Sequence, residues 1–278
     1  MEDEARRSEE EPVPPPVNII DVERPSAARM YDYFLGGAHN FEADRRVAEQ
    51  TKAAFPGIVP TIQANRAFLR RAVQFLVDEG VRQFLDIGSG IPTVGHVHEI
   101  AQHTAPESRV VYVDIDPVAV AYSKEILTGN DLTAVIQEDA RQPEQILDHP
   151  DLRQLIDFDQ PVAVLVVALF HFIPDSDDPA GLIRRFAAPL CSGSYLALSH
   201  ASEDGLTDDA VARGREIYRR SGVEMVTRTH AQVAALFNEF ELVEPGLVRG
   251  SLWRPDAGAE VDDRPETVAG YAGVGRKP

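Results

Sequence analysis

The stretch of sequence that decides the fold is Val81-Arg82-Gln83-Phe84-Leu85-Asp86-Ile87-Gly88-Ser89-Gly90. Its apolar residues are typical of a buried strand, and its two glycines then end that strand in a tight turn. Glycine is needed where the backbone takes a positive φ or lies close to a ligand. The apolar residues of the following segment, 91–101, have helical spacing. The stretch therefore predicts a strand, a glycine turn and a helix, the arrangement of a nucleotide-binding turn in an open α/β sheet.

The details of the turn decide which nucleotide it suits. A dinucleotide-binding Gly-x-Gly-x-x-Gly turn needs a third glycine at position 93, where Thr93 stands. The carboxylate of Asp86 would repel a pyrophosphate and suits a ligand that carries an amine. The turn resembles the Asp-x-Gly-x-Gly turn of Rossmann-like S-adenosylmethionine-dependent methyltransferases, which implies that Asp86, Gly88, Ser89 and Gly90 bind this cofactor. The structural alternative is a tight turn whose aspartate caps the next helix.

A second predicted strand, 109–114, also ends in carboxylates. Asp114 is placed to accept hydrogen bonds from both ribose hydroxyls, since an acid at this strand end has that role in related sheets. Ile115 would then lie against the adenine. Asp116 stands directly before Pro117 and is more simply the N-cap of the next helix. The glycine turn and this acid at this spacing indicate a nucleoside site more specifically than either does alone.

The third and fourth predicted strands, 133–137 and 162–167, add polar groups at the same edge. Asp139, or the backbone of Ala140, is the candidate for hydrogen bonds to the adenine, with a helix cap as the structural alternative. The fourth strand ends at Ala168, whose backbone we expect beside the cofactor. His171 follows it and is the first candidate for a general base, which a hydroxyl or amine substrate requires. His39 and His200 are weaker candidates.

The segment before the glycine turn has the pattern of helices. They run over about 26–50, with a break at Gly36-Gly37, and over about 62–79. Tyr31 and Tyr33 either pack in the core of the first helix or belong to a lid over the binding turn, with Gly36 and Gly37 allowing the backbone close to the ligand. We include all four in the predicted cofactor site.

The alternation of strands and helices after residue 80 predicts an α/β fold with a doubly wound, mostly parallel sheet. A closing hairpin around Gly250 would add an antiparallel edge strand. We expect three parts: a disordered acidic, proline-rich tail at 1–17, an N-terminal helical cap at 18–80 and the S-adenosylmethionine-binding Rossmann-like domain at 81–278.

The composition is that of a soluble globular protein, with 44% hydrophobic and 26% charged residues among 278. The formal charge of −18 disfavours nucleic acid as a partner and favours a small molecule. The single cysteine, Cys191, excludes an internal disulfide, argues against a structural zinc ion and fits a reducing compartment. No apolar run has membrane-spanning length, and no signal-peptide pattern is present. We expect a cytoplasmic protein with no metal and no membrane partner.

Several segments together resemble an actinobacterial family of S-adenosylmethionine-dependent methyltransferases formerly described as a domain of unknown function. The matching segments are Arg29 to Gly37 with Asn40, Phe41 and Asp44, then Asn65-Arg66, 83–90, 113–117 and 274–277. The resemblance spans nearly the whole chain after the proline-rich tail. It implies a seven-stranded sheet, a helical N-terminal cap and S-adenosylmethionine as the cofactor. It does not supply a substrate.

The sequence therefore favours an S-adenosylmethionine-dependent methyltransferase acting on the oxygen or nitrogen of a small-molecule methyl acceptor. One alternative is a non-catalytic S-adenosylmethionine- or nucleoside-binding protein, which would share every cofactor residue. The other is an NAD(P)-dependent oxidoreductase, disfavoured by Asp86 and Thr93. The identity of the acceptor and the oligomeric state stay open.

Overall fold

The computed structural model describes residues 21–91, 95–259, 261, 264 and 268–278. The predicted disordered tail at 1–17 and Thr93 lie outside the described residues. The strands are β1 (Gln83–Ile87), β2 (Arg109–Asp114), β3 (Thr133–Gln137), β4 (Ala163–Val167), β5 (Tyr195–His200), β6 (Glu241–Leu242), β7 (Val248–Arg249) and β8 (Tyr271–Arg276).

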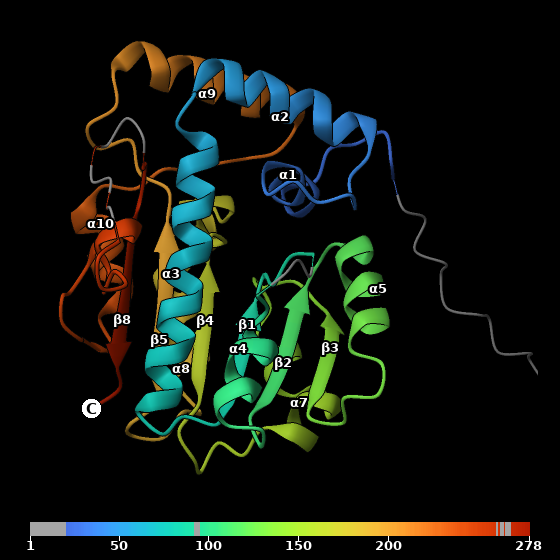
Figure 1. The fold of residues 1–278 in the computed structure, drawn as a ribbon, viewed down its shortest axis with the longest axis vertical. Coiled ribbons are helices and arrows are strands. Elements are labelled where there is room, and N and C mark those ends of the chain that lie inside the picture. The colour runs from blue at the N-terminus through green and yellow to red at the C-terminus, as the bar shows by residue number, and fades with distance from the viewer. Residues whose placement is uncertain (1–20, 92–94, 260, 262–263, 265–267) are drawn as a thin grey trace, which may run out of the picture.

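The helices alternate with the strands as predicted (Figure 1). The α-helices are α1 (Ala27–Phe34), α2 (Glu42–Ala54), α3 (Ile58–Asp78), α4 (Val97–Thr104), α5 (Pro117–Ile126), α6 (Pro143–Leu147), α7 (Pro150–Leu155), α8 (Pro179–Ala187), α9 (Asp208–Ser221) and α10 (His230–Ala234). Short 3₁₀ turns are η1 (Phe170–Phe172), η2 (Asp175–Asp177), η3 (Ala235–Phe237) and η4 (Gly250–Leu252).

One mixed sheet organises the molecule, with strand order β3-β2-β1-β4-β5-β8-β6, and β7 pairs with β8 outside this path. Strands β1 to β5 are parallel, and β8 is antiparallel to β5. The doubly wound, mostly parallel α/β sheet is therefore confirmed. β1 lies at the centre, with β2 on one side and β4 on the other. The order in which successive strands are added to the sheet therefore reverses at β1. Ligands bind at such a switch point.

The predicted closing hairpin around Gly250 is wrong. Gly250 begins η4, and β6 and β7 each pair with β8 rather than with each other. The antiparallel strand comes from residues 271–276 instead. Its glycines hid it, since glycine is depleted in strands. They are required here, because a Cβ atom on Gly275 would lie 2.7 Å from Cβ of Phe240.

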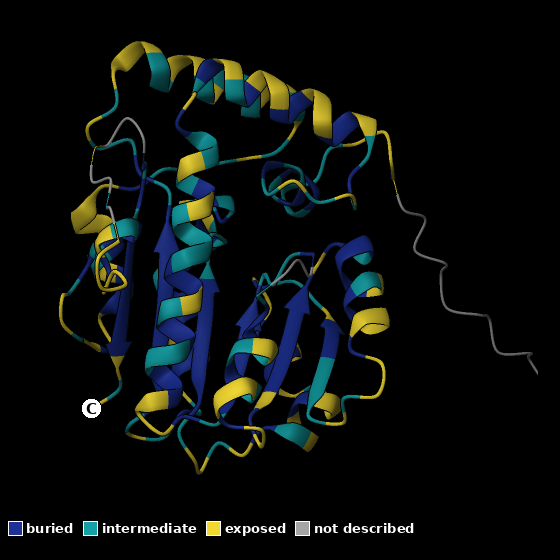
Figure 2. Ribbon diagram, viewed as in Figure 1, coloured by how far each residue is buried: buried dark blue, intermediate teal, exposed yellow. Residues whose placement is uncertain are grey.

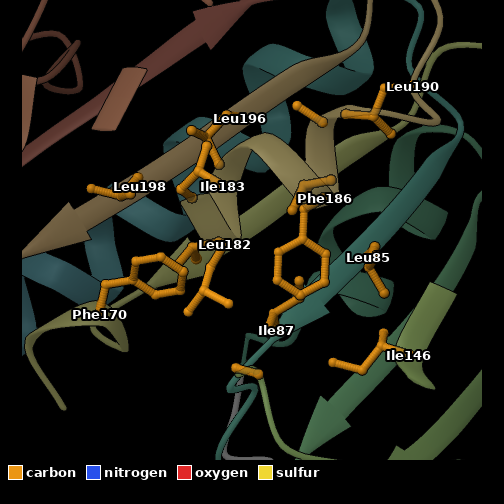
Figure 3. Close-up of a cluster of buried hydrophobic side chains, with 14 of the residues drawn as sticks. Leu85, Ile87, Ile146, Phe170, Leu182, Ile183, Phe186, Leu190, Leu196 and Leu198 are labelled. Carbon is orange, nitrogen blue, oxygen red and sulfur yellow. The ribbon is translucent and has the colours of Figure 1, made fainter. Parts of the chain in front are cut away.

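Alternate residues of each central strand enter cores on opposite faces of the sheet. On one face, Leu85 and Ile87 pack with α6, α7 and α8, and Figure 3 shows Phe186 and Leu182 of α8 among the buried side chains there. On the other face, Phe84 packs with α3 and α4. Figure 2 shows the strands buried almost throughout. This period of two on both faces is what a parallel sheet covered by helices requires.

Helices from both halves of the sequence cover the carboxyl ends of the strands. Figure 1 shows α1, α2 and α9 across this end of the sheet, and α2 packs on α9. Met30 and Phe34 of α1 form a small core with Val47 of α2, against which Tyr218 of α9 packs. The predicted N-terminal cap thus acquires α9 as a further element. Among the described residues, no helix is long and apolar enough to cross a membrane.

We predict that Gly275→Ala lowers the free energy of unfolding by roughly 1–3 kcal/mol, because the new methyl group overpacks the contact with Phe240 and Phe237. The matched control is Gly214→Ala in α9, where a Cβ meets no atom within 4 Å. It should raise that free energy by roughly 0.5–1 kcal/mol, since alanine favours a helix interior. Urea denaturation measures both. Equal effects of the two substitutions would contradict the packing assigned to β8.

Candidate active site

A cavity of about 750 Å³ lies at the carboxyl ends of the parallel strands, beneath α1, α3 and α9. This volume is in the range of pockets that hold small-molecule ligands. The structure brings most of the predicted site residues together in its lining: Tyr31, Asp86, Gly88, Ser89, Gly90, Asp114, Ile115, Asp139, Ala140, Ala168 and His171. Tyr33, Gly36 and Gly37 do not line it.

Asp86 is the penultimate residue of β1, and its buried carboxylate lies at the cavity wall. Among the described residues, no donor forms a hydrogen bond to its side chain. Burial raises its pKa to about 7, with the guanidinium of Arg66 opposing this rise and the carboxylate of Asp114 adding to it. A buried acid without a donor is unfavourable for the fold. Its position favours a ligand that brings a positive charge and N–H groups.

The glycine turn after Asp86 is required by conformation at both of its glycines. Gly88 has φ of 71° and Gly90 has φ of 68°, in the left-handed region. A Cβ atom on Gly88 would also lie 2.6 Å from the side chain of Leu169, whereas Gly90 meets no atom within 4 Å. The turn therefore leaves the backbone at Gly90 open toward the cavity.

Asp114 holds this turn in place. Its Oδ2 atom accepts a hydrogen bond of 2.7 Å from the backbone N–H of Gly90, and its Oδ1 atom accepts one of 2.8 Å from that of Asp116. Burial raises the pKa of Asp114 to about 6, although these two hydrogen bonds oppose the rise. Each oxygen keeps lone pairs for a ligand. The next residue, Ile115, is apolar yet 58% exposed, as a platform for a flat ring requires.

Two of the capping alternatives have clear outcomes. Asp116 caps α5 by accepting from the N–H of Val118 at 2.8 Å, as predicted. Asp139 does not cap α6 with its side chain. It binds the guanidinium and the N–H of Arg141 instead. Burial raises the pKa of Asp139, but the hydrogen bonds from Arg141 outweigh burial and the net pKa is lowered. Its carboxylate is thus already engaged beside the cavity.

Tyr31 of α1 is tied to the sheet by a chain of side-chain hydrogen bonds. The amide nitrogen of Asn65 donates to the hydroxyl of Tyr31 at 2.9 Å, and the hydroxyl of Ser199 donates to Oδ1 of Asn65 at 2.5 Å. Ser199 Oγ also accepts from the N–H of Ala168 at 2.9 Å. Ala168 has φ of 57°, which is strained for a residue with a side chain. The network thus joins the strained end of β4 to α1.

The remaining residues of the predicted lid have a different position. The hydroxyl of Tyr33 donates to Glu49 on the surface. Gly37 is needed because a Cβ atom there would lie 2.0 Å from Oδ1 of the buried Asp32. Asp32 also accepts from the amide of Asn40 at 2.8 Å. Gly36 and Gly37 therefore close a loop around a carboxylate of this chain, rather than lying against the cavity.

α1 is also anchored at its first turn. Arg29, which is buried, contacts Asp44 of α2 at 2.9 Å and Asp116 at 3.4 Å. The hydroxyl of Ser26 donates to the same Asp116 carboxylate. One acid at the end of β2 thus caps α5 and holds α1 over the cavity.

His171 lies in η1, buried beside the end of β5. Its Nδ1 atom accepts a long hydrogen bond of 3.4 Å from the N–H of Ala201, and its ring centroid lies 5.6 Å from that of His200. Burial, with the charges of His200 and Arg228, holds the pKa of His171 well below its usual value. The imidazole is therefore neutral, as a base must be. The lone pair lies on Nδ1, so taking up a proton there means giving up the contact with Ala201.

The sequence did not single out Arg228, which is buried behind the histidines. It binds Nε2 of His200 at 2.7 Å, the carbonyl oxygens of Phe170 and Ile173, and Asp175. No pattern marked it, because it stands alone in a loop. Nor did the sequence give roles to Asn65, Ser199 and Tyr218, although polar Asn65-Arg66 on an otherwise apolar helix was a usable signal. Among the described residues, no cluster of histidine, cysteine and acidic side chains could hold a metal ion.

The chain is similar in sequence to a known protein family. The model of the S-adenosyl methyltransferase family matches residues 15–278. No curated protein sequence is significantly similar to the chain.

Solved structures are also similar. The crystal structure of a DUF574 family protein from Streptomyces avermitilis has 42% identity and a TM-score of 0.90, over 94% of this chain and 100% of that one. A methyltransferase candidate from Thermobifida fusca has 40% identity and a TM-score of 0.87, over 93% and 97%. The N-methyltransferase NodS from Bradyrhizobium japonicum, solved with S-adenosyl-L-homocysteine, has 14% identity and a TM-score of 0.50, over 90% and 99%, a likeness of fold alone.

We predict that Asp86→Asn stabilises the ligand-free protein at pH 8 by roughly 1–4 kcal/mol, because it removes a buried charge. The pKa of about 7 in the folded protein lies above the usual aspartate value of 3.8, so protonation of Asp86 favours the fold at low pH. This contribution is complete below pH 3.8, falls as the pH rises from there to about 7, and is lost above that value, so the advantage of the variant should grow over this range and then level off. Urea denaturation at a series of pH values measures it.

The control for this prediction is Asp44→Asn, the same substitution at a buried acid paired with Arg29. It should destabilise the protein at pH 8 by about 3–5 kcal/mol, since it removes the nearer of the two carboxylates that pair with the buried guanidinium of Arg29. If Asp86→Asn also destabilised the protein at pH 8, the carboxylate of Asp86 would have a stabilising partner in the ligand-free protein, and the prediction would be wrong.

Proposed function

The chain belongs to the S-adenosyl methyltransferase family, and we propose that it methylates the oxygen or nitrogen of a small molecule in this cavity. It is a methyltransferase whose cofactor is S-adenosylmethionine. The observation that carries the proposed site is the buried carboxylate of Asp86, which has no hydrogen-bond donor among the described residues and lines a cavity of about 750 Å³.

The residues at the ends of β1, β2 and β3 fit this cofactor. We assign Asp86 to its amine, since a carboxylate with a pKa near 7 gains most from a positive partner. Asp114 keeps lone pairs for the ribose hydroxyls, and the exposed Ile115 offers an apolar surface for adenine. Gly88, Ser89 and Gly90 bring backbone close to it. Ala140 and Ala168 line the same cavity, and the side chain of Asp139 is shared with Arg141.

S-adenosylmethionine supplies an electrophilic methyl group, which an in-line nucleophile removes. The protein's contribution to such a displacement is mainly to position the nucleophile and exclude water. α1 and α9 cover the strand ends and exclude water from the cavity. His171 takes the proton of the acceptor at Nδ1 in our assignment, replacing the long contact with Ala201.

The test of the cofactor site is calorimetric titration with S-adenosylmethionine, S-adenosylhomocysteine and NAD. We expect micromolar binding of the first two compounds. We expect no binding of NAD, because the carboxylate of Asp86 would repel its pyrophosphate. Asp114→Ala should weaken binding of the first two by about 1–3 kcal/mol through lost charge-assisted hydrogen bonds. Binding of NAD alone would overturn the assignment of Asp86, and an unchanged dissociation constant would remove Asp114 from the site.

For His171 we predict that His171→Gln lowers kcat by about 10²–10⁴-fold while the dissociation constant of S-adenosylmethionine stays unchanged. Glutamine keeps an acceptor near Ala201 but takes up no proton. The control is His39→Gln, because His39 lies outside the cavity lining, against Tyr122. Loss of cofactor binding, or an unchanged kcat, would rule out the general base.

A further inference from the structure

The cavity extends beyond the residues assigned to the cofactor. Those residues lie at the ends of β1 to β3, whereas the rest of the lining lies over β4 and β5 and beneath α9. We call this part the acceptor compartment. Besides His171, it is lined by side chains that are mostly apolar: Ile58, Ile62, Leu206, Val211, Tyr218 and Met225. An apolar lining favours an apolar ligand, since burying a charge there costs much more than burying a hydrocarbon.

The two arginines that line the cavity near this compartment each have an acidic neighbour. Arg215 of α9 donates to Glu203 through Nε and Nη2, at 2.9 and 2.5 Å. Arg66 faces Asp86 on the cofactor side. Glu224 stands exposed at the rim and adds negative charge. Among the described residues that line the acceptor compartment, a carboxylate or phosphate on the acceptor would therefore find no unpaired cation to bind directly, and Arg228 lies behind the histidines, outside this lining.

A positively charged acceptor is disfavoured for a separate reason. The guanidinium of Arg228 is buried behind the histidines, 2.7 Å from Nε2 of His200. Its ionic partner, Asp175, is mostly exposed, so water screens that carboxylate more than the guanidinium. An ammonium group beside His171 would be repelled by this charge, whereas an oxygen that gains negative charge during the reaction would be stabilised.

An uncharged polar group of the compartment also favours a neutral acceptor. Tyr218 lines it, and its hydroxyl has no hydrogen-bond partner among the described residues. Burial raises the pKa of Tyr218 to about 12, so the hydroxyl stays neutral. A neutral donor and acceptor of this kind pairs with a neutral polar group on a ligand.

We propose, building on the methyltransferase function above, that the acceptor is a neutral, mainly apolar molecule that presents a hydroxyl group of phenol or enol type to His171. In the transfer, the O–H bond breaks, the new O–CH₃ bond forms and the S–CH₃ bond of the cofactor breaks. The electron pair of that last bond stays on sulfur, and the proton passes through His171 to water, because burial and the charge of Arg228 disfavour a lasting imidazolium. The reaction is O-methylation.

The test uses three probes with one ring system: 2-naphthol, 2-naphthoate and the ammonium form of 2-naphthylmethylamine. Each is titrated into protein saturated with S-adenosylhomocysteine. We expect the naphthol to bind at least about tenfold more tightly than either ion. With S-adenosylmethionine in place of the product, mass spectrometry should detect the methyl ether of the naphthol and no methylated amine or ester.

A charge introduced by substitution makes the test independent of the native affinity. Val211→Arg places a guanidinium in the compartment and should reverse the preference, so that the naphthoate binds more tightly than the naphthol. Ala212→Arg is the matched control, because Ala212 is the next residue of α9, is exposed and does not line the cavity. It should leave the order of the three probes unchanged.

The outcomes separate this inference from the function it rests on. Equal or tighter binding of the naphthoate or the ammonium by the native protein would overturn the neutral acceptor, as would methylation of the amine. Failure of all three probes to bind protein that does bind S-adenosylhomocysteine would overturn the apolar compartment. Failure to bind S-adenosylhomocysteine at all would instead overturn the proposed cofactor site. An unchanged order in Val211→Arg would place the probes outside the compartment.

Discussion

The hydrogen bonds that Asp114 accepts from Gly90 and Asp116 are the constraint on which the rest of the site depends. They lock the turn after β1 to the end of β2, and so fix where Asp86 stands. Asp86 is thereby left in a buried position with no donor of its own among the described residues, with its pKa raised to about 7. In the proposed function the same position gives the amine of the ligand a strong partner, and stability is often lower where a site is preorganised.

The second organising feature is that the cover of the site is assembled from distant parts of the chain. α1 is fixed to the sheet through Asn65 and Ser199, and to α5 through Asp116. α9 reaches the same region from the other half of the sequence and packs on α2. Each contact joins a covering helix to a strand end or to another cover helix. The same contacts therefore position both the covering helices and the polar groups at the strand ends.

Much of this could be predicted from the sequence, and the failures have physical causes. The glycine turn and the cap at Asp116 rest on local rules, and the structure shows the geometry each requires. Gly37 was assigned to the ligand because a glycine in the sequence indicates that a side chain is excluded. The sequence does not show which group excludes it, and in the structure that group is the side chain of Asp32. The roles of Arg228 and Ser199 arise from contacts between remote segments, which no local pattern encodes.

The position of β8 has a consequence for the order in which the molecule is made. This strand pairs with β5 along six residues, yet seventy residues separate the two in the sequence, between His200 and Tyr271. During synthesis, every other strand of the sheet leaves the ribosome before it. The edge of β5 therefore stays open for that time, and an unpaired strand edge invites pairing with other chains. The newborn protein is most exposed to aggregation just before its last strand arrives.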